Sequence, residues 1–147
     1  MKKQAYTMIA MFVLVGSMAV AAKAQTGGRT QLIANIPFDF NVGNKTMPAG
    51  EYTLSQVNPA SDQAVLQFRS KDGHAGVMVR MASVIGRAQE SSKLIFNSYG
   101  NRYFFAQAWI DGDNSGLQAP KSRAERAVER ELAGNGRKTE TIALGHQ

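Results

Sequence analysis

The sequence contains no cysteine and only two histidines in 147 residues. Without a thiol, the chain forms no disulfide and cannot use a cysteine nucleophile, a zinc–thiolate site or an iron–sulfur cluster. His74 and His146 do not stand in an H-E-x-x-H run, and the chain has no G-x-S-x-G segment. We therefore predict that the protein is not an enzyme. A hydrolase that uses a carboxylate pair is the weakest alternative, because no spacing favours any two acids.

A strong charge of one sign is also missing. The formal net charge of the full chain is +6, but Lys2, Lys3 and Lys23 lie near its start. Residues 25–117 carry eight basic and seven acidic side chains. Nucleic-acid binding requires lysine and arginine clustered on one face, so we predict no nucleic-acid partner.

The start of the chain has the pattern of an export signal. Lys2 and Lys3 precede an apolar run from Met8 to Val20, and Ala22-Lys23-Ala24 has the small residues that a signal peptidase recognises. We expect a signal peptide over residues 1–24 and a periplasmic or secreted mature chain. The apolar run is short for a membrane span, so no stable span is expected after cleavage. The alternative is an uncleaved anchor.

Without residues 1–24, 123 of the 147 residues remain, which suits a single domain. We predict one β-rich domain with a C-terminal helix over residues 25–133. Residues 134–147 show little pattern and are expected to form a flexible tail.

The stretch from Ile36 to Leu54 predicts two strands with a turn between them. Apolar residues alternate with polar ones at its start and again at Tyr52 and Leu54. Pro48 fixes its φ angle and Gly50 tolerates a positive one, so both belong in the connection. The stretch predicts how the chain folds and names no activity.

The same stretch resembles a known family. The segments A-N-I-P-F-D-F at 34–40 and M-P-A-G-E-Y at 47–52 are similar to the pattern of a family of small exported bacterial proteins, and the likeness continues at 98–104 and 120–123. That family has no assigned activity. The resemblance implies export and a β-rich fold, and it supplies no catalytic residue.

A first hairpin is predicted around Asp72-Gly73, which is a strong two-residue turn pattern. With that turn, Phe68 pairs with Val77 and Leu66 pairs with Val79. This register separates an apolar face from a mostly polar one, which favours it.

A second hairpin is predicted over 94–99 and 102–110, with Gly100 first in a two-residue turn. In this register Phe96 pairs with Phe105, and Leu94 and Trp109 share their face. The opposite face carries Ile95, Phe104, Ala106, Ala108 and Ile110. Because both faces are largely apolar, the hairpin is covered on both sides or presents a binding surface.

A helix is predicted to begin after Ser122, since Ser122 and Glu125 form a capping box, and to end near Ala133. Val128 and Leu132 lie on its narrow apolar stripe. A helix with so thin a stripe needs a surface to lie on. We expect Val128 and Leu132 to cover the second face of the hairpin 94–110.

The loop after that hairpin is the sharpest chemical feature. Asp111, Asp113 and Ser115 alternate and Gly116 follows, as at the start of an EF-hand calcium loop. The glutamate expected at position 12 is replaced by Ser122. The three residues are therefore a weak Ca²⁺ candidate, and a solvated turn with no cofactor is the favoured interpretation.

Four aromatic residues form a weak candidate surface for a ligand or partner: Tyr99, Tyr103, Phe104 and Trp109. Large aromatic side chains stack on sugar rings or apolar ligands, but most of them belong to protein cores. A core role is the favoured alternative.

Together these patterns predict a mainly β fold, an antiparallel β-sandwich or flattened barrel with one short C-terminal helix. The predicted function is an exported, non-catalytic binding or scaffold module of the cell envelope. Its partner would be an envelope protein, a glycan or a small apolar ligand. The main alternative is a carrier that holds a small apolar ligand in an aromatic-lined barrel interior.

Overall fold

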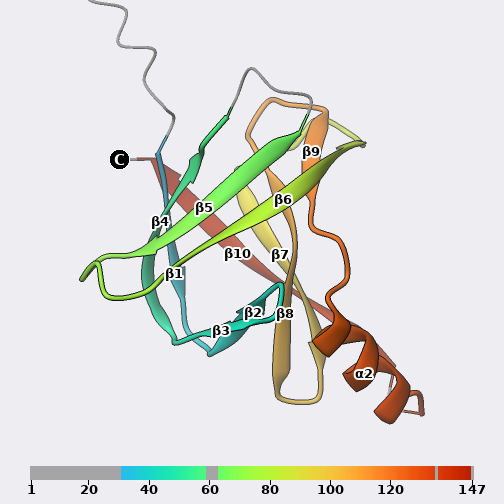
Figure 1. Cartoon of the computed structure of the whole chain (residues 1–147). Coiled ribbons are helices and arrows are strands. Elements are labelled where there is room, and N and C mark those ends of the chain that lie inside the picture. Colours follow the sequence, from blue (N-terminus) through green and yellow to red (C-terminus); the bar gives the residue numbers. More distant parts are fainter. Residues whose placement is uncertain (1–30, 59–62, 135, 147) are drawn as a thin grey trace, which may run out of the picture.

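The computed structural model describes residues 31–58, 63–134 and 136–146, so the predicted signal peptide over 1–24 lies outside the described residues. These residues form ten strands and one helix, which carry the labels β1 to β10 and α2 in Figure 1. The strands are β1 Leu32–Ile36, β2 Phe40–Val42, β3 Lys45–Met47, β4 Gly50–Gln56, β5 Ala64–Ser70, β6 Gly76–Ile85, β7 Lys93–Tyr99, β8 Arg102–Trp109, β9 Ser115–Gln118 and β10 Lys138–His146, and α2 is Arg123–Glu131.

Eight of the strands close into an antiparallel barrel. Their order is β8-β7-β10-β1-β4-β5-β6-β9, and β9 pairs again with β8 to complete the ring. The short strands β2 and β3 are extra, and β2 pairs with β8 in parallel at Asn41 and Phe104. The prediction of a mainly β fold, flattened barrel or sandwich, with one short helix is confirmed.

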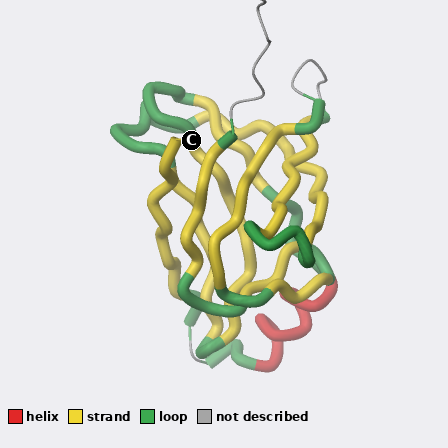
Figure 2. Tube along the Cα trace, turned by 90° about the vertical axis from the view of Figure 1, so that its left-hand side faces the viewer, coloured by secondary structure: helices red, strands yellow, loops and turns green. Residues whose placement is uncertain are grey.

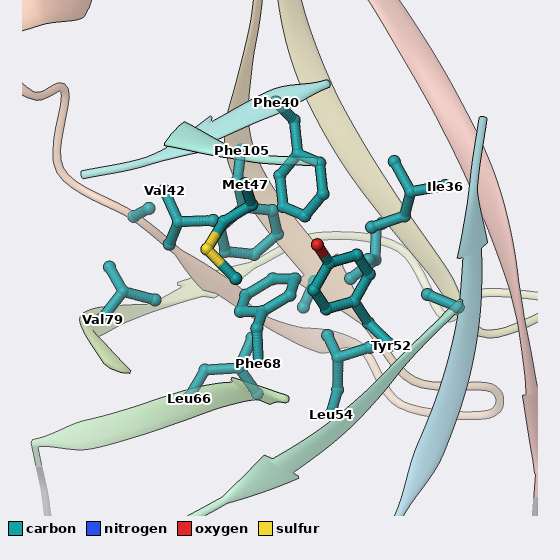
Figure 3. Packing of buried hydrophobic residues seen from close by; sticks show 14 of the residues in the cluster. Ile36, Phe40, Val42, Met47, Tyr52, Leu54, Leu66, Phe68, Val79 and Phe105 are labelled. Carbon is teal, nitrogen blue, oxygen red and sulfur yellow. The ribbon is translucent and has the colours of Figure 1, made fainter. Parts of the chain in front are cut away.

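The β2–β3 hairpin fills one end of the barrel. Phe40, Val42 and Met47 are at most 1% exposed, and Figure 3 shows them pointing toward Tyr52 and other core side chains. Removing a side chain of this size from water contributes about 1.5–3 kcal/mol. The hairpin therefore acts as a plug that the barrel buries on folding.

Residues 48–52, the P-A-G-E-Y part of the predicted connection, form the turn that follows the plug. The backbone N–H of Ala49 donates to Oδ1 of Asp39 at 2.9 Å, and the hydroxyl of Tyr52 donates to the carbonyl of Pro48 at 2.6 Å. Gly50 has a φ of 154°, a conformation that side chains rarely adopt. These residues hold the connection from β3 to β4 against the barrel.

The β5–β6 hairpin has the predicted register, with Leu66 opposite Val79 and Phe68 opposite Val77. The predicted two-residue turn is wrong. The N–H of Ser70 donates to the carbonyl of Ala75 at 2.8 Å, so the loop spans 71–74. Gly73, with a φ of 76°, is the one residue of this loop in the left-handed conformation.

The β7–β8 hairpin keeps the predicted pairing of Phe96 with Phe105, but the register shifts between Ile95 and Phe96. Because Ile95 is opposite Gln107, Ala106 has no partner on β7 and forms a bulge. The bulge reverses the faces beyond it. The prediction that Trp109 shares the face of Leu94 is therefore wrong.

The flexible tail predicted over 134–147 is also wrong, because Lys138–His146 forms β10 between β1 and β7. Its side chains are exposed except for the half-buried Ile142 and Leu144. The strand is held by backbone pairing rather than by burial, so it has little of the apolar alternation that marks a strand in a sequence.

Helix α2 lies at one end of the barrel, beside the β7–β8 hairpin (Figures 1 and 2). The hydroxyl of Ser122 accepts from the N–H of Glu125 at 3.0 Å, which confirms the cap. Val128 is buried against Tyr99 and Phe104, with Leu132 packed beside it. Part of the second face of the hairpin is thus covered as predicted.

Candidate functional site

The four aromatic residues proposed as a ligand surface do not gather in one place. Tyr99 and Phe104 lie under α2, with their ring centroids 5.9 Å apart. Tyr103 stacks on Phe38, with centroids 3.9 Å apart and planes at 15°. These three are packing residues in the structure.

Trp109 is only 7% exposed, because it lies flat over two glycines. A Cβ built at Gly86 or at Gly116 would come within 2.6 Å of its ring. Its Nε1–H donates to Oε1 of Gln107 at 3.0 Å. Trp109 thus covers the outside of the barrel at β9, away from the aromatic pair under α2.

The acidic loop is closed by its own hydrogen bonds. The carboxylate of Asp113 accepts from the N–H of Ser115 at 3.0 Å and from its hydroxyl at 2.8 Å. These bonds lower the pKa of Asp113. The N–H of Asp111 donates to the hydroxyl of Ser92 at 2.9 Å. Within 31–58, 63–134 and 136–146, no three His, Cys, Asp or Glu side chains gather as a metal site.

Two described acids near the β5–β6 loop, Glu51 and Asp72, each lie beside a basic side chain. They border an open cavity of about 410 Å³. Glu51 is 3.1 Å from Nζ of Lys71, and Asp72 is 3.6 Å from Nδ1 of His74. Hydrogen bonds from Ser70 and from the N–H of His74 lower the pKa of Asp72, the opposite of what a general acid needs.

The interior of the barrel is occupied by aromatic rings. Neighbouring centroids lie 4.9 to 6.0 Å apart. The rings are those of Phe40, Tyr52, Phe68, Phe96 and Phe105. They are in edge-to-face or tilted contact, so this part of the interior is filled (Figure 3).

A polar cavity lies beside α2, on the outer face of the barrel, and has a volume of about 310 Å³. We call it the α2 cavity. Its apolar part is Ile95, Ala106 and Ala119, and its polar part is Asn97, Gln107, Gln118, Lys121, Glu125, Arg137 and Thr139. Its lining comes from β7, β8, β9, β10, α2 and the segments on either side of α2, so it forms only when the barrel is closed.

Glu125 is the central group of the α2 cavity and is only 3% exposed. Its Oε1 accepts from Nδ2 of Asn97 at 2.8 Å and from the hydroxyl of Tyr99 at 3.1 Å. Its Oε2 accepts no hydrogen bond from the described residues. No buried side-chain oxygen among those residues lacks a partner, so Oε2 is reached from the solvent of the cavity that Glu125 lines.

The hydroxyl of Tyr99 stays protonated near neutral pH. Burial, followed by the charge of Glu125 and the hydrogen bond to it, raises the pKa of Tyr99 to about 12. The hydroxyl therefore always donates to Glu125. This fixes the carboxylate in one orientation and leaves its other oxygen for a ligand.

Two cations face the α2 cavity, and they differ in their partners. Nζ of Lys121 donates to Oε1 of Glu129 at 2.6 Å, and that bond lowers the pKa of Glu129. Arg137 is exposed and forms no ion pair within the described part of the chain. Its positive charge helps to lower the pKa of Glu129, but no hydrogen bond to a described residue holds the guanidinium, so its N–H groups can donate to a ligand.

The α2 cavity was not predicted from the sequence. Glu125 was explained completely by its position in the capping box, yet it shares a helix face with Val128 and Leu132, at spacings of three and seven. A carboxylate on the apolar stripe of a helix was the available indication. Arg137 was missed because it lies in the segment expected to be a flexible tail.

Comparison with models of protein families, with curated proteins and with solved structures finds no match to this chain. Among the described residues, no helix is long and apolar enough to cross a membrane. The resemblance to a family of small exported proteins stays a prediction.

Proposed function

We propose that this protein is an exported, non-catalytic binding module of the cell envelope, and that the α2 cavity binds a hydroxyl-rich ligand such as a glycan. The observation that carries the proposal is Glu125, a buried carboxylate that keeps one oxygen free inside a cavity. Export rests on the pattern of residues 1–24 and on the family resemblance.

The chemistry of the lining favours a hydroxylated ligand. A sugar hydroxyl both donates, which Oε2 of Glu125 requires, and accepts, which the guanidinium of Arg137 requires. The amides of Gln107 and Gln118 take part in either role. An apolar ligand would leave the carboxylate desolvated and unpaired, at a cost of at least about 1–3 kcal/mol.

The cavity also supports binding rather than hydrolysis. A glycosidase places two carboxyl groups on either side of the bond that it cleaves. Glu125 is the one acid in the lining of the α2 cavity. Its volume of about 310 Å³ is at the small end of the range of ligand sites, roughly 300–1,000 Å³, which suits a short segment of a glycan.

The test uses Glu125→Gln, which has the same shape and keeps an oxygen for Asn97 and Tyr99 but turns an amide donor toward the ligand. The mature protein is screened against oligosaccharides of bacterial envelopes, and the best one is titrated calorimetrically. We expect Glu125→Gln to weaken binding at least about tenfold, because a hydrogen bond to a charged group contributes about 1.5–3 kcal/mol.

The matched control is Glu131→Gln, on the same helix. Glu131 lies 3.6 Å from Arg102 on the surface, outside the α2 cavity. The Glu131→Gln variant should bind the oligosaccharide with the same affinity as the unchanged protein. Equal affinity of the unchanged protein and Glu125→Gln would overturn the proposed site, and so would the absence of any binding oligosaccharide.

A carrier of small apolar ligands is the second candidate, because a barrel with a buried aromatic cluster is compatible with it. An apolar ligand would have to displace rings that are already in contact, such as Phe68 and Phe105 at 4.9 Å. Native mass spectrometry of the exported protein distinguishes the candidates. A co-purified apolar molecule that is retained in Glu125→Gln would favour the carrier.

A further inference from the structure

The α2 cavity contains a carboxylate and a guanidinium that do not neutralise each other. Glu125 and Arg137 both line the cavity, but they form no ion pair. The carboxylate of Glu125 takes its hydrogen bonds from two neutral groups, Nδ2 of Asn97 and the hydroxyl of Tyr99. No acid of the described residues forms an ion pair with Arg137. A ligand in the cavity therefore meets one unpaired positive charge as well as the free oxygen of Glu125.

The register of β10 places Arg137 on the side of the chain that faces the cavity. Thr139 is opposite Asn97 on β7, and both line the cavity. Arg137 comes two residues before Thr139, which is the spacing that returns a side chain to the same face of a strand. The pKa of Glu129 is lowered first by the hydrogen bond from Lys121 and then further by the charge of Arg137. The guanidinium thus lies close enough to α2 for its charge to act on that helix.

The elements around the α2 cavity carry a surplus of positive charge. Residues 118–147 contain six basic and four acidic side chains, and one of the acids is the buried Glu125. Arg123, Arg126 and Arg130 follow one another at spacings of three and four along α2. All three are exposed and form no ion pair with a described residue. An anionic ligand is therefore attracted to the end of the barrel where α2 lies (Figures 1 and 2).

A glycan that carries carboxylates satisfies both charged groups of the cavity. A guanidinium binds a carboxylate through two parallel N–H donors, whereas a neutral hydroxyl leaves its charge unbalanced. The hydroxyls of the same sugar donate to Oε2 of Glu125. We infer that the α2 cavity takes an acidic glycan built from uronic acids, and that Arg137 binds the carboxylate of one sugar. The inference rests on the proposed function, because it names the class of glycan that the cavity takes.

An anionic membrane surface would also attract this positive charge, but α2 does not suit it. A helix that binds at a membrane interface buries an apolar face there. The apolar residues of α2, Val128 and Leu132, pack on the barrel instead. Among the described residues, the most exposed large apolar side chains are Met78 and Ile85, and both lie on β6. A lipid headgroup would also bring no set of hydroxyls for the carboxylate of Glu125, so the structure favours the glycan.

The test compares a short oligogalacturonate with its methyl ester, which keeps the hydroxyls and removes the charge. Both are titrated calorimetrically into the mature protein at low ionic strength. We expect the acid to bind about five- to tenfold more tightly than the ester, because the pair with Arg137 is a charge-assisted hydrogen bond. Arg137→Gln should lose this preference and bind the ester with about the same affinity as the unchanged protein. The matched control is Arg130→Gln, which removes the same charge from α2 outside the cavity and should keep the preference.

The outcomes separate this inference from the proposed function. Equal affinity of acid and ester for the unchanged protein, with both weakened in Glu125→Gln, would overturn the acidic glycan and leave the glycan site standing. Binding of neither would also overturn it, whereas a neutral envelope oligosaccharide that Glu125→Gln weakens would still support the proposed function. A preference that Arg137→Gln and Arg130→Gln reduce alike would refute the role of Arg137. Displacement of the acid by vesicles of phosphatidylglycerol would make a membrane surface the partner and overturn the inference.

Discussion

A single methyl group at Gly116 should destabilise the barrel through Trp109. A Cβ at this position would lie 2.6, 2.7 and 2.8 Å from three atoms of the Trp109 ring. Ordinary contact begins at about 3.4 Å, so the ring or the strand must move by about 0.8 Å. The ring is buried, and β9 is paired on both sides. Overpacking of this kind costs about 1–3 kcal/mol.

We therefore expect Gly116→Ala to lower the melting temperature by about 4–12 °C, at roughly 4 °C per kcal/mol for a domain of this size. Urea unfolding followed by circular dichroism measures the free energy of unfolding. Trp109 is the only tryptophan, so its emission reports on this contact directly. The control is Gly134→Ala, because no atom lies within 4 Å of a Cβ there and its φ is not left-handed.

A double-mutant cycle makes the reasoning specific. In a Trp109→Leu background the flat ring is gone, and Gly116→Ala should cost at least about 1 kcal/mol less than in the unchanged protein. The same cycle tests the bulge at Ala106. Without the bulge, the alternation of side chains along β8 would place Trp109 in the barrel interior with Leu94, far from Gly116. If Gly116→Ala is as stable as Gly134→Ala, the placement of Trp109 on the outer face is wrong.

Three further predictions concern other parts of the chain. Val128→Ala should lower the free energy of unfolding by about 2 kcal/mol, since two buried carbon groups are lost against Tyr99 and Phe104, whereas the exposed Ala127→Ser should change it little; equal urea midpoints would contradict the packing of α2. The pKa of Asp113 is lowered in the folded state, so its stabilisation is present above its unfolded pKa, near 4, and is lost as pH falls through the folded value. Below pH 4, the melting temperature of Asp113→Asn should therefore fall less steeply with pH than that of the unchanged protein. Equal pH dependence of the two melting temperatures would refute the role of the loop bonds. Export should produce a mature chain that begins at Gln25, which N-terminal sequencing verifies; a chain that keeps Met1 would disprove cleavage.

The registers of both long hairpins were predictable from the sequence because one face of each is buried. A slip of one residue would place Phe68 or Phe96 in water, so the apolar pattern alone fixes the pairing. The bulge was not predictable by the same argument. Ala106 is small enough for either face, and no glycine or proline marks the position at which the alternation reverses.

Strand β10 shows the opposite limit. Its sequence K-T-E-T-I-A-L-G-H contains three aliphatic side chains, and the strand exists because β1 and β7 present edges that must be paired. That requirement comes from the rest of the barrel, so the sequence of the strand itself does not predict it. The α2 cavity shares this limit, since Arg137 and Thr139 reach it only after β10 is placed.

The position of the α2 cavity in the sequence limits what the family resemblance predicts about binding. Of the segments that carry the resemblance, 34–40 and 47–52 run from β1 through the plug into β4, where Phe40 and Met47 are fully buried, whereas 120–123 includes Lys121 of the cavity lining. The lining of the cavity comes from Ile95 to Thr139, in the second half of the chain. A protein that shares only the segments 34–40 and 47–52 would be expected to have the barrel and not the binding site. A relative in which Glu125 and Asn97 are both present would be the informative one, because those two residues form the anchored carboxylate.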